Sequence, residues 1–587
     1  MGDSHNNGNS STALQPVFKR TVPVNAARFA PSPTGSLHIG GLRSALFSWA
    51  HAQKIKGRFI LRIEDTDRKR FVPGSMYEIL QVLHEFGLSP DQYPSVDQIQ
   101  KSINNDFGWY THDWAQHLDK LEGIKSQDFD NVFIQSLRLA LYQKAAIELV
   151  RRGFAYFCFC SPQRLEKVNK QRRSKGLQPG YDKHCKVTHD LSDAFELIKK
   201  GHRPVVRMDF DAFAKHLGTN KLVYTDALLG KIEFDLSLQN HGVLLKSDGF
   251  PTYHLAVVVD DYLMGVHTTI RGYEWVSSIP KHVLVATGLG LDLPQTVHLP
   301  VILDPKGGKL SKRHGAVSVF GILQQGYLHE AILNFLMYLG FNPIQDGQDP
   351  KITLQEFVQN FDILKVSKSN PVFDRTKLVY FNKRYLTDIN LYEFNRRFVE
   401  YVTRFKYDII ESALNTCDLT DTACPIPEKC LNSDSLSSIV DKIVKDFTNS
   451  LPAKLDMLKV RTDDMLTIFK MLVPFYTKTL KITDFGQIKG VKRYDASTIH
   501  KALAEFKNYI KEHDMFKNNQ EFVAFVRDLA DRYNIKHADM FMAIRLATYG
   551  SNISPPLFDY LRILCNNYDK NIVIDKIDQY LKWVSQL

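Results

Sequence analysis

The chain has 587 residues, of which 75 are Lys or Arg and 64 are Asp or Glu, so its formal net charge is +11 and its pI is near 9.0. An apolar fraction of 44% and a charged fraction of 24% are typical of globular proteins and exclude wholesale disorder. No run of about 18 apolar residues occurs, so no segment is expected to span a membrane. At roughly 100–200 residues per domain, the length predicts about three to five domains.

Most of the excess positive charge lies in one stretch. Residues 151–207 hold 14 Lys and Arg against five Asp and Glu, whereas residues 387–587 hold 28 against 27. A basic excess favours a polyanionic partner such as a nucleic acid. Because a charge run is usually a solvated surface, two interpretations stay open at this point, a solvated face and a phosphate-binding module.

The seven cysteines and the N-terminal residues bear on the compartment. An odd number of cysteines without a secretory segment argues against a disulfide framework and favours a reducing environment. The first twenty residues contain a single acidic residue, Asp3, and organelle transit peptides are likewise poor in acidic residues. These twenty residues nevertheless lack the Arg-rich amphipathic pattern of such peptides. A tail that is either disordered or targeting is therefore expected over residues 1–25.

The first predicted elements form a βαβ unit. Residues 26–30 are predicted to be a strand, which the Pro-rich segment 31–35 ends. Apolar residues recur at helical spacing from Leu42 to Ala50, Gly57 ends this helix, and residues 58–63 are a second buried strand. Strand, helix and strand at this spacing predict a parallel sheet.

The rest of the chain divides into strand-rich and helical parts. Residues of about 96–132 are polar without a strong period, which predicts a surface insertion. A helix is expected over residues 137–152 and a strand over 205–208, and three apolar runs at 243–245, 255–259 and 301–303 are further buried-strand candidates. From Phe320 to the C-terminus a helical period dominates, so this part is expected to be a helical bundle.

Two motifs carry phosphate chemistry. Residues 36–41 (SLHIGG) open the first helix, whose unpaired N–H groups and positive dipole end suit a phosphate, with His38 as a further donor. Residues 304–313 (DPKGGKLSKR) form a Gly-rich loop with a hydroxyl and several cations, which suits a clamp on a triphosphate. Each motif in isolation favours a simpler interpretation, a turn with a hydrogen-bonded histidine and a solvated basic loop.

Together, the two motifs resemble those of the class I aminoacyl-tRNA synthetases. The segments between them are similar to the bacterial-type glutamyl-tRNA synthetases, over about residues 26–386, and the similarity is faint beyond. The segments that carry it are Arg28–Gly35, Arg62–Asp67, Lys246–Ala256, Val259–Gly265 and Ile270–Trp275.

The resemblance implies an α/β fold and a domain order. A Rossmann-like class I catalytic core is expected in two halves, residues 26–150 and 208–319, separated by an acceptor-binding insertion over 151–207. Residues 320–386 would form a stem-contact helical domain and residues 387–587 an all-α anticodon-binding region. This assignment accounts for the local charge, because binding the acceptor end of a tRNA requires cations for its phosphates.

The implied activity is ATP- and Mg²⁺-dependent ligation of L-glutamate to tRNA-Glu through a glutamyl-adenylate. A bacterial-type enzyme in a eukaryote implies an organelle, so the mitochondrial matrix is favoured over the cytoplasm, and a monomer is expected. Two alternatives stay open, a glutaminyl-tRNA synthetase and a catalytically silent tRNA-binding relative.

The resemblance also assigns site residues. Arg28 would pair with the side-chain carboxylate of glutamate, Glu64 would hold its ammonium group, and Arg271 would add a second cation, although an internal ion pair between Arg271 and Glu64 is the alternative. The catalytic residues are His38, Lys309 and Lys312. The ATP-binding residues are His38, Gly40, Gly41, Glu274, Lys309, Leu310, Ser311, Lys312 and Arg313. The glutamate-binding residues are Arg28, Phe29, Ala30, Ser32, Glu64, Tyr253, His254, Leu255, Ala256, Val257 and Arg271.

The resemblance fails at one position and implies a metal site at another part of the chain. Val257 stands where the family usually has Asn, so its side chain offers no amide to the substrate. Some family members bind zinc in the inserted segment, which implies a structural Zn²⁺ on Cys158, Cys160 and Cys185 with His189 or His184 as fourth ligand. The alternative for these thiols is reduced cysteines in a strand and turn.

Overall fold

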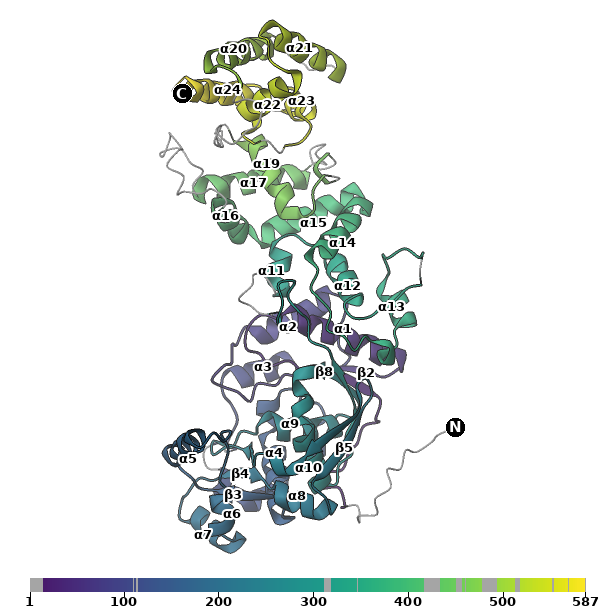
Figure 1. Ribbon diagram of the computed structural model, residues 1–587, viewed down its shortest axis with the longest axis vertical. Helices are drawn as coiled ribbons and strands as arrows, with labels where there is room; N and C mark the ends of the chain where they lie inside the picture. Colours follow the sequence, from purple (N-terminus) through teal and green to yellow (C-terminus); the bar gives the residue numbers. More distant parts are fainter. Residues whose placement is uncertain are drawn as a thin grey trace. The chain divides into compact units, whose positions relative to one another are not determined.

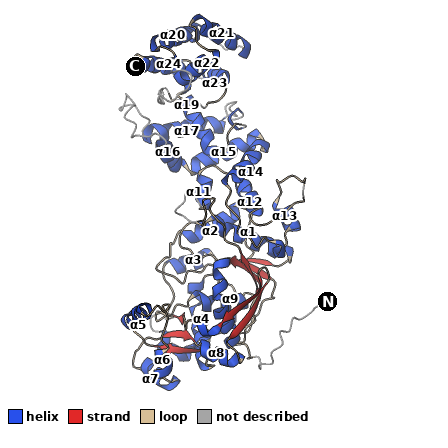
Figure 2. Ribbon diagram, in the orientation of Figure 1, coloured by secondary structure: helices blue, strands red, loops and turns tan. Residues whose placement is uncertain are grey.

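A four-stranded parallel sheet forms the centre of the N-terminal part of the chain (Figure 1, Figure 2). The computed structural model describes residues 14–108, 110–111, 114–310, 318–345, 347–415, 433–449, 457–459, 461–477, 493–512, 518–551, 554–567 and 569–585. The strand order is β2-β1-β8-β9, and each neighbouring pair is parallel. The strands are β1 (Ala26–Phe29), β2 (Arg58–Leu61), β8 (Val266–Gly272) and β9 (Gln295–Leu299).

Helix α1 (Ile39–Lys54) connects β1 to β2 and packs on the sheet, which confirms the predicted βαβ unit. The chain leaves this helix in a tight turn. Lys56 has a φ of 52°, and Gly57 passes so close to the Asn25 carbonyl oxygen that a Cβ would lie 1.8 Å from it. Gly57 is required for this close backbone approach.

The remaining helices of this core are α2 (Ser75–Glu85), α3 (Val96–Ile103), α4 (Leu139–Arg151), α9 (Tyr253–Leu263) and α10 (Ile279–Leu289). The strand prediction for residues 255–259 is wrong, because this run is the middle of α9. A short apolar run cannot distinguish a buried strand from a buried helix. Since α9 packs against α4, α10 and β8, nearly all its faces are buried, and it shows little of the amphipathic period of a surface helix. The prediction for residues 301–303 is also wrong, because the strand ends at Leu299, just before Pro300.

The polar segment 96–132 is more than a surface insertion. It contains α3, and the side chain of Trp114 is fully buried. The tail predicted for residues 1–25 is likewise too long, because residues from Leu14 onward pack on the core. Val17 donates its N–H to the Leu289 carbonyl at 3.0 Å, and Phe18 is buried in the main core cluster.

The segment between the two halves of the core extends past residue 207, because β4 pairs with β7, and over residues 155–245 this inserted segment builds two small sheets. A three-stranded antiparallel sheet joins β3 (Ala155–Cys158), β4 (Val205–Met208) and β7 (Val243–Leu245), and a hairpin follows β4. The predicted boundary at residue 207 therefore falls inside a strand that pairs with a later one. The hairpin strands are β5 (Lys221–Asp226) and β6 (Gly230–Asp235), and the helices are α5 (Pro162–Ser174), α6 (His184–Thr188), α7 (Leu191–Lys199) and α8 (Phe210–Leu217).

The chain forms two compact units. The first comprises the described residues up to Phe320 together with Leu333–Asp374, and the second comprises Gly321–Ile332 and Arg375 onward. The predicted boundary at residue 386 lies within α14, so the second unit begins before it. Between the last strand and this helix lie α11 (Val319–Gln324), α12 (His329–Met337) and α13 (Leu354–Asn360).

From α14 onward every element in the described ranges is helical, which confirms the predicted α-helical C-terminal region. None of the described helices is long and apolar enough to pass through a bilayer. The helices are α14 (Arg375–Asp388), α15 (Leu391–Arg404), α16 (Lys406–Asn415), α17 (Ser433–Asn449), α19 (Met465–Tyr476), α20 (Ala496–Glu512), α21 (Asn519–Arg532), α22 (His537–Tyr549), α23 (Leu557–Asn567) and α24 (Asn571–Val584).

Candidate functional site

Arg28 lies in the carboxyl half of β1, and its guanidinium is buried and hydrogen-bonded. It is 4% exposed, and its Nε and Nη2 donate to the two carboxylate oxygens of Asp261 at 3.2 and 3.3 Å. Arg62 donates to the same carboxylate at 2.6 Å. Burial alone would raise the pKa of Asp261, but the two guanidinium groups outweigh it and hold that pKa at about 2. Asp261 is therefore ionised and neutralises part of the charge of both arginines.

Glu64 lies beside this cluster. Its Oε1 accepts from Arg62 Nη2 at 3.0 Å, and the carboxylate is mostly buried. Burial raises the pKa of Glu64, and the nearby Arg62 and Arg28 only partly offset that effect. The alternative of an ion pair between Glu64 and Arg271 is wrong, because Glu64 pairs with Arg62.

Arg271, on β8, has a different set of partners. It is 7% exposed, and its Nε donates to His298 Nε2 at 2.9 Å while its Nη1 donates to the Tyr253 hydroxyl at 3.0 Å. A longer contact of 3.4 Å reaches His282 Nδ1. Burial lowers the pKa of both histidines, so both are neutral near pH 7. Among the described residues no carboxylate lies within 4 Å of the Arg271 guanidinium, whose charge is thus not paired.

Tyr253 connects these groups. It begins α9, and its ring lies 4.1 Å from that of Trp275, centroid to centroid. Burial raises the pKa of Tyr253, and Arg271, Glu64 and Arg28 all lie close enough to act on it. The hydroxyl therefore marks the place where the predicted glutamate-binding side chains converge.

The other predicted glutamate-binding residues lie around this point or behind it. Phe29 is buried, and Ala30 and the exposed Ser32 follow β1 in the loop. His254 is half-buried and contacts His282 at 3.3 Å. Leu255 and Ala256 are fully buried in the core cluster, so only their backbone can serve the site.

Val257 lines a small buried cavity behind the site. The cavity is also lined by Arg271, His282 and Thr269. The side chain at the family's usual Asn position thus shares this cavity with Arg271 and contributes methyl groups rather than a hydrogen bond.

His38 caps helix α1. Its Nδ1 accepts from the Gly41 N–H at 3.1 Å, so a neutral ring carries its proton on Nε2. There is little room beside it. A Cβ at Gly40 would lie 3.1 Å from His38 Nδ1, and one at Gly41 would lie 2.7 Å from the end of the Leu37 side chain. A larger residue at Gly40 would therefore press on the imidazole that caps the helix.

The second motif forms a tight turn. Asp304 accepts from Gly307 and donates to Gly308 through their backbones, and both glycines have positive φ. Lys309 follows, and its Nζ donates to Glu274 Oε1 at 3.2 Å. Two predicted ATP-binding side chains are thus brought together. Leu310 donates its N–H to Ile302, whereas the predicted residues Ser311, Lys312 and Arg313 lie outside the described residues.

The chain is similar in sequence to known families and proteins. Residues 25–380 match the family of class I tRNA synthetase catalytic domains for E and Q, and residues 418–568 match an anticodon binding domain. A glutamate–tRNA ligase of Finegoldia magna is 36% identical over 479 residues, covering 79% of this chain and 89% of that relative. One of Borrelia recurrentis is 33% identical and covers 96% of each chain.

The chain belongs to the glutamate–tRNA ligases, within the class I synthetases. A crystal structure of a glutamate tRNA ligase from Elizabethkingia meningosepticum, in complex with its amino acid, matches with a TM-score of 0.63. It is 24% identical and covers 95% of this chain and 99% of that one, which supports the fold. The predicted fold class and enzyme class are confirmed.

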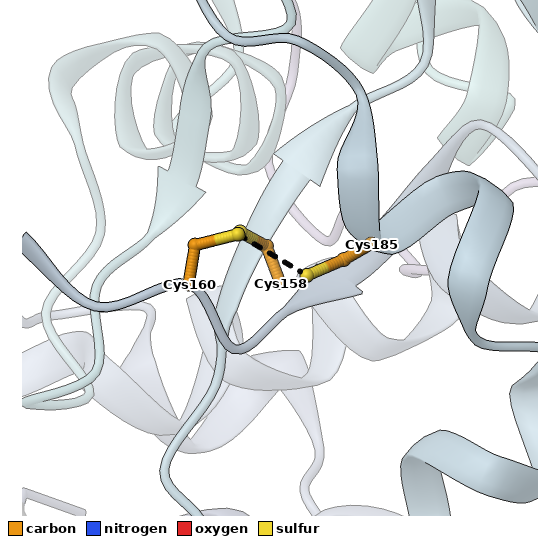
Figure 3. A group of neighbouring side chains, drawn as sticks. All are labelled: Cys158, Cys160 and Cys185. Carbon is orange, nitrogen blue, oxygen red and sulfur yellow. Dashed lines mark hydrogen bonds between the residues drawn. The ribbon is translucent and has the colours of Figure 1, made fainter. Parts of the chain in front are cut away.

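The insertion carries a thiol cluster (Figure 3). The sulfur atoms of Cys158, Cys160 and Cys185 lie within 4.8 Å of one another. The Tyr181 hydroxyl lies 3.3 Å from Cys158 Sγ and 3.5 Å from Cys160 Sγ. Neither His184 nor His189 lies within this distance of the three sulfur atoms, and a histidine as fourth ligand stays a prediction. The three thiols suit zinc, which takes four ligands in a structural site.

Several residues that hold the predicted side chains in place were not predicted from the sequence. Asp261 and Arg62 lie within the quoted motifs without an assigned role, and Tyr181, His298 and Asp226 lie outside them. Their partners are far away in sequence, 233 residues in the case of Arg28 and Asp261. No local pattern could have identified these contacts.

Proposed function

We propose that the chain joins L-glutamate to tRNA-Glu in two steps as a monomer. The α-carboxylate of glutamate attacks the α-phosphorus of ATP and pyrophosphate leaves. The terminal ribose hydroxyl of the tRNA then attacks the adenylate carbonyl and AMP leaves. The observation that carries the proposal is Arg271, a cation beside Tyr253 that no carboxylate pairs in the described part of the chain, in a chain that belongs to the glutamate–tRNA ligases.

Glutamate selection follows from the partners of the two arginines. Arg28 already shares the Asp261 carboxylate, whereas Arg271 contacts only neutral groups among the described residues. A buried cation with neutral partners gains most from an incoming anion. We therefore assign the side-chain carboxylate of glutamate mainly to Arg271, with Arg28 nearby. Glutamine, which is neutral, would leave that cation unpaired.

ATP activation relies on position and charge. The α1 N-terminus and the Nε2–H of His38 would receive phosphate oxygens, and Lys309 would leave Glu274 to meet the developing negative charge. Mg²⁺ would arrive with ATP, since no group of three metal-ligating side chains lies beside His38 in the described part of the chain. Bound there, it would neutralise phosphate charge.

We assign the tRNA acceptor end to the insertion. Helix α5 has no buried residue and carries five basic side chains against one acid. Such a helix presents its cations to a phosphate backbone, and the affinity it supplies falls steeply with salt. The helical C-terminal region would read the anticodon.

We further propose a structural zinc site of three thiolates and the Tyr181 oxygen. Metal analysis of the purified protein should find one zinc per chain. Cys160→Ser and Tyr181→Phe should lower zinc retention against a chelator, and His189→Ala should leave it unchanged. A protein without stoichiometric zinc would show that these are simply reduced cysteines.

A mitochondrial matrix location is the remaining proposal. It is supported by the acid-poor first twenty residues and by relatives that are bacterial. A chain tagged at its C-terminus should co-fractionate with matrix markers, and a tagged chain found in the cytosol would overturn the assignment.

A direct test of the activation step is ATP–pyrophosphate exchange with glutamate, in the presence of tRNA-Glu. Exchange that depends on glutamate is expected. A protein that binds the tRNA but supports no exchange would be a catalytically silent relative instead.

A further inference from the structure

Arg271 is the first member of a chain of hydrogen bonds that leads away from the amino-acid site. Its Nε donates to His298 Nε2 at 2.9 Å, and His298 Nδ1 lies 2.7 Å from Asp226 Oδ2. His298 and Asp226 are both essentially inaccessible to solvent. The chain thus connects β8 to β9 and then to the end of β5, 72 residues away in sequence from His298.

The Asp226 carboxylate is itself fixed on every side. Its Oδ1 accepts the N–H groups of Leu228 and Leu229 at 3.0 and 2.9 Å, which closes the turn between β5 and β6. Its Oδ2 accepts from the Thr296 hydroxyl at 3.0 Å as well as from His298. Each oxygen therefore faces donors, which only a carboxylate can satisfy.

This arrangement decides the tautomer of His298. Because a carboxylate can only accept, the proton of the neutral ring lies on Nδ1, and Nε2 carries the lone pair. That lone pair receives the Arg271 Nε–H. The Arg271 guanidinium is thereby held by a neutral acceptor, which fixes its orientation and leaves its charge unpaired.

We propose that Asp226 and His298 are positioning residues that hold Arg271 ready for the side-chain carboxylate of glutamate. The inference rests on the proposed role of Arg271 and adds a reason for its geometry. A carboxylate in place of His298 would hold the guanidinium equally well but would neutralise it. The imidazole orients the cation, and Asp226 orients the imidazole from the inserted hairpin.

Asp226→Asn is the sharpest single test. The amide would have to turn its NH₂ group either toward the two backbone N–H groups or toward Thr296 and His298. In the second case His298 would take the other tautomer, and its Nε2–H would oppose the Arg271 Nε–H. Either orientation of the amide disturbs the Asp226–His298–Arg271 chain, because a hydrogen bond to a charged group is lost.

The experiment measures tRNA-dependent ATP–pyrophosphate exchange in the full-length protein. Asp226→Asn and His298→Ala should raise the KM for glutamate about ten- to a hundred-fold and leave the KM for ATP within about twofold. The ratio of kcat/KM for glutamate to that for glutamine should fall as well. His298→Gln places an amide oxygen near the position of Nε2 and should recover much of the loss.

Tyr224→Phe is the matched control. Tyr224 lies on the same hairpin and contacts only the Thr296 hydroxyl in this array, at 3.1 Å. This variant should retain the wild-type KM for glutamate and the wild-type selectivity.

The outcomes separate the inference from its premise. If Arg271→Ala leaves the KM for glutamate unchanged, the role of Arg271 and this inference both fail. If Arg271→Ala raises that KM while Asp226→Asn and His298→Gln behave as wild type, only the positioning role fails. A merely structural role would lower kcat/KM for glutamate and glutamine equally and would equally refute the inference. If His298→Ala does not fold, the Asp226→Asn, His298→Gln and Tyr224→Phe measurements still decide the question.

Discussion

Arg28 and Arg271 are two buried arginines of the parallel sheet that differ in their bonding. Arg28 shares Asp261 with Arg62, so its charge is largely balanced within the protein. Arg271 is held by His298 and Tyr253, which are neutral. Both residues are arginines, so their different roles follow from their hydrogen-bond partners rather than from the residue type. Asp261 emerges as a structural anchor, and Arg271 as the group with charge available for a substrate.

Replacing Asp261 should be costly for stability. Asp261→Asn leaves two buried guanidinium groups without their shared carboxylate, and we expect a loss of about 3–5 kcal/mol in the free energy of unfolding. Urea denaturation of the variant and the wild type measures it. Thr269→Val, which removes only the hydroxyl donor to Asp261, is the milder comparison. A loss below about 1 kcal/mol for Asp261→Asn would contradict the anchoring role.

The same carboxylate makes an acid-dependent contribution. The pKa of Asp261 is about 2 in the folded chain and about 3.9 when unfolded, so its stabilisation is fully present above about pH 4. This contribution declines as the pH falls toward 2. Asp261→Asn should remove that part of the acid sensitivity.

Lys309 should matter for ATP because its side chain lies beside Glu274 at the end of the glycine turn. Lys309→Ala should slow adenylate formation about a hundred-fold, since a cation placed for developing charge is lost. Single-turnover adenylate formation is the measurement. Lys306→Ala, an exposed lysine in the same turn, should remain near wild type. Equal effects of the two substitutions would mean that only the overall charge of the loop counts.

Among the elements, predictions succeeded where Pro and Gly residues ended an element at the same place as the spacing of its apolar residues did. The strand at residue 26, helix α1 and the strand at residue 58 are separated by Pro31 and Gly57, and each prediction is confirmed. Helix α9 was mistaken for a strand because burial on nearly all sides weakens the amphipathic period that identifies a helix. The Asp226–His298–Arg271 chain could not be predicted, since it depends on how β5, β8 and β9 are brought together.

A buried lysine links two helices and a tyrosine of the C-terminal region. Lys576 on α24 donates to the Pro474 carbonyl at the end of α19 and to the Tyr560 hydroxyl. Burial lowers the pKa of Lys576 to about 7, against about 10.4 in an unfolded chain. Between these values the folded state binds fewer protons than the unfolded state. The free energy of unfolding should therefore rise from about pH 7 to about pH 10, and the cost of the buried charge is fully present below pH 7.

Hydrogen exchange of the α24 amides, corrected for intrinsic exchange rates, tests this at pH 7 and pH 9. Protection should increase with pH in the wild type, and Lys576→Met should abolish the increase. A slope that persists in Lys576→Met would show that another group titrates.

At the scale of the whole molecule, the charge and the active site belong to different parts of the first compact unit. The basic excess lies in the insertion, where α5 exposes its cations, whereas the amino-acid site lies at the parallel sheet. The hairpin that supplies Asp226 belongs to the inserted segment and contacts β9. The hairpin therefore supports the side chain of Arg271 through His298. Sequence similarity identified the family and proposed the substrate-binding residues, but it did not identify the residues, such as Asp261 and His298, that hold the side chains of Arg28 and Arg271 in place.

Selection of glutamate by charge and its transfer to tRNA are the activities that we propose for this chain. Aminoacylation of separate tRNA-Glu and tRNA-Gln transcripts with labelled glutamate, and then with labelled glutamine, tests them most directly. Glutamate should be esterified to tRNA-Glu, and glutamine should not be esterified to either transcript. Charging of glutamine at a comparable rate, or no charging of either amino acid, would contradict the account.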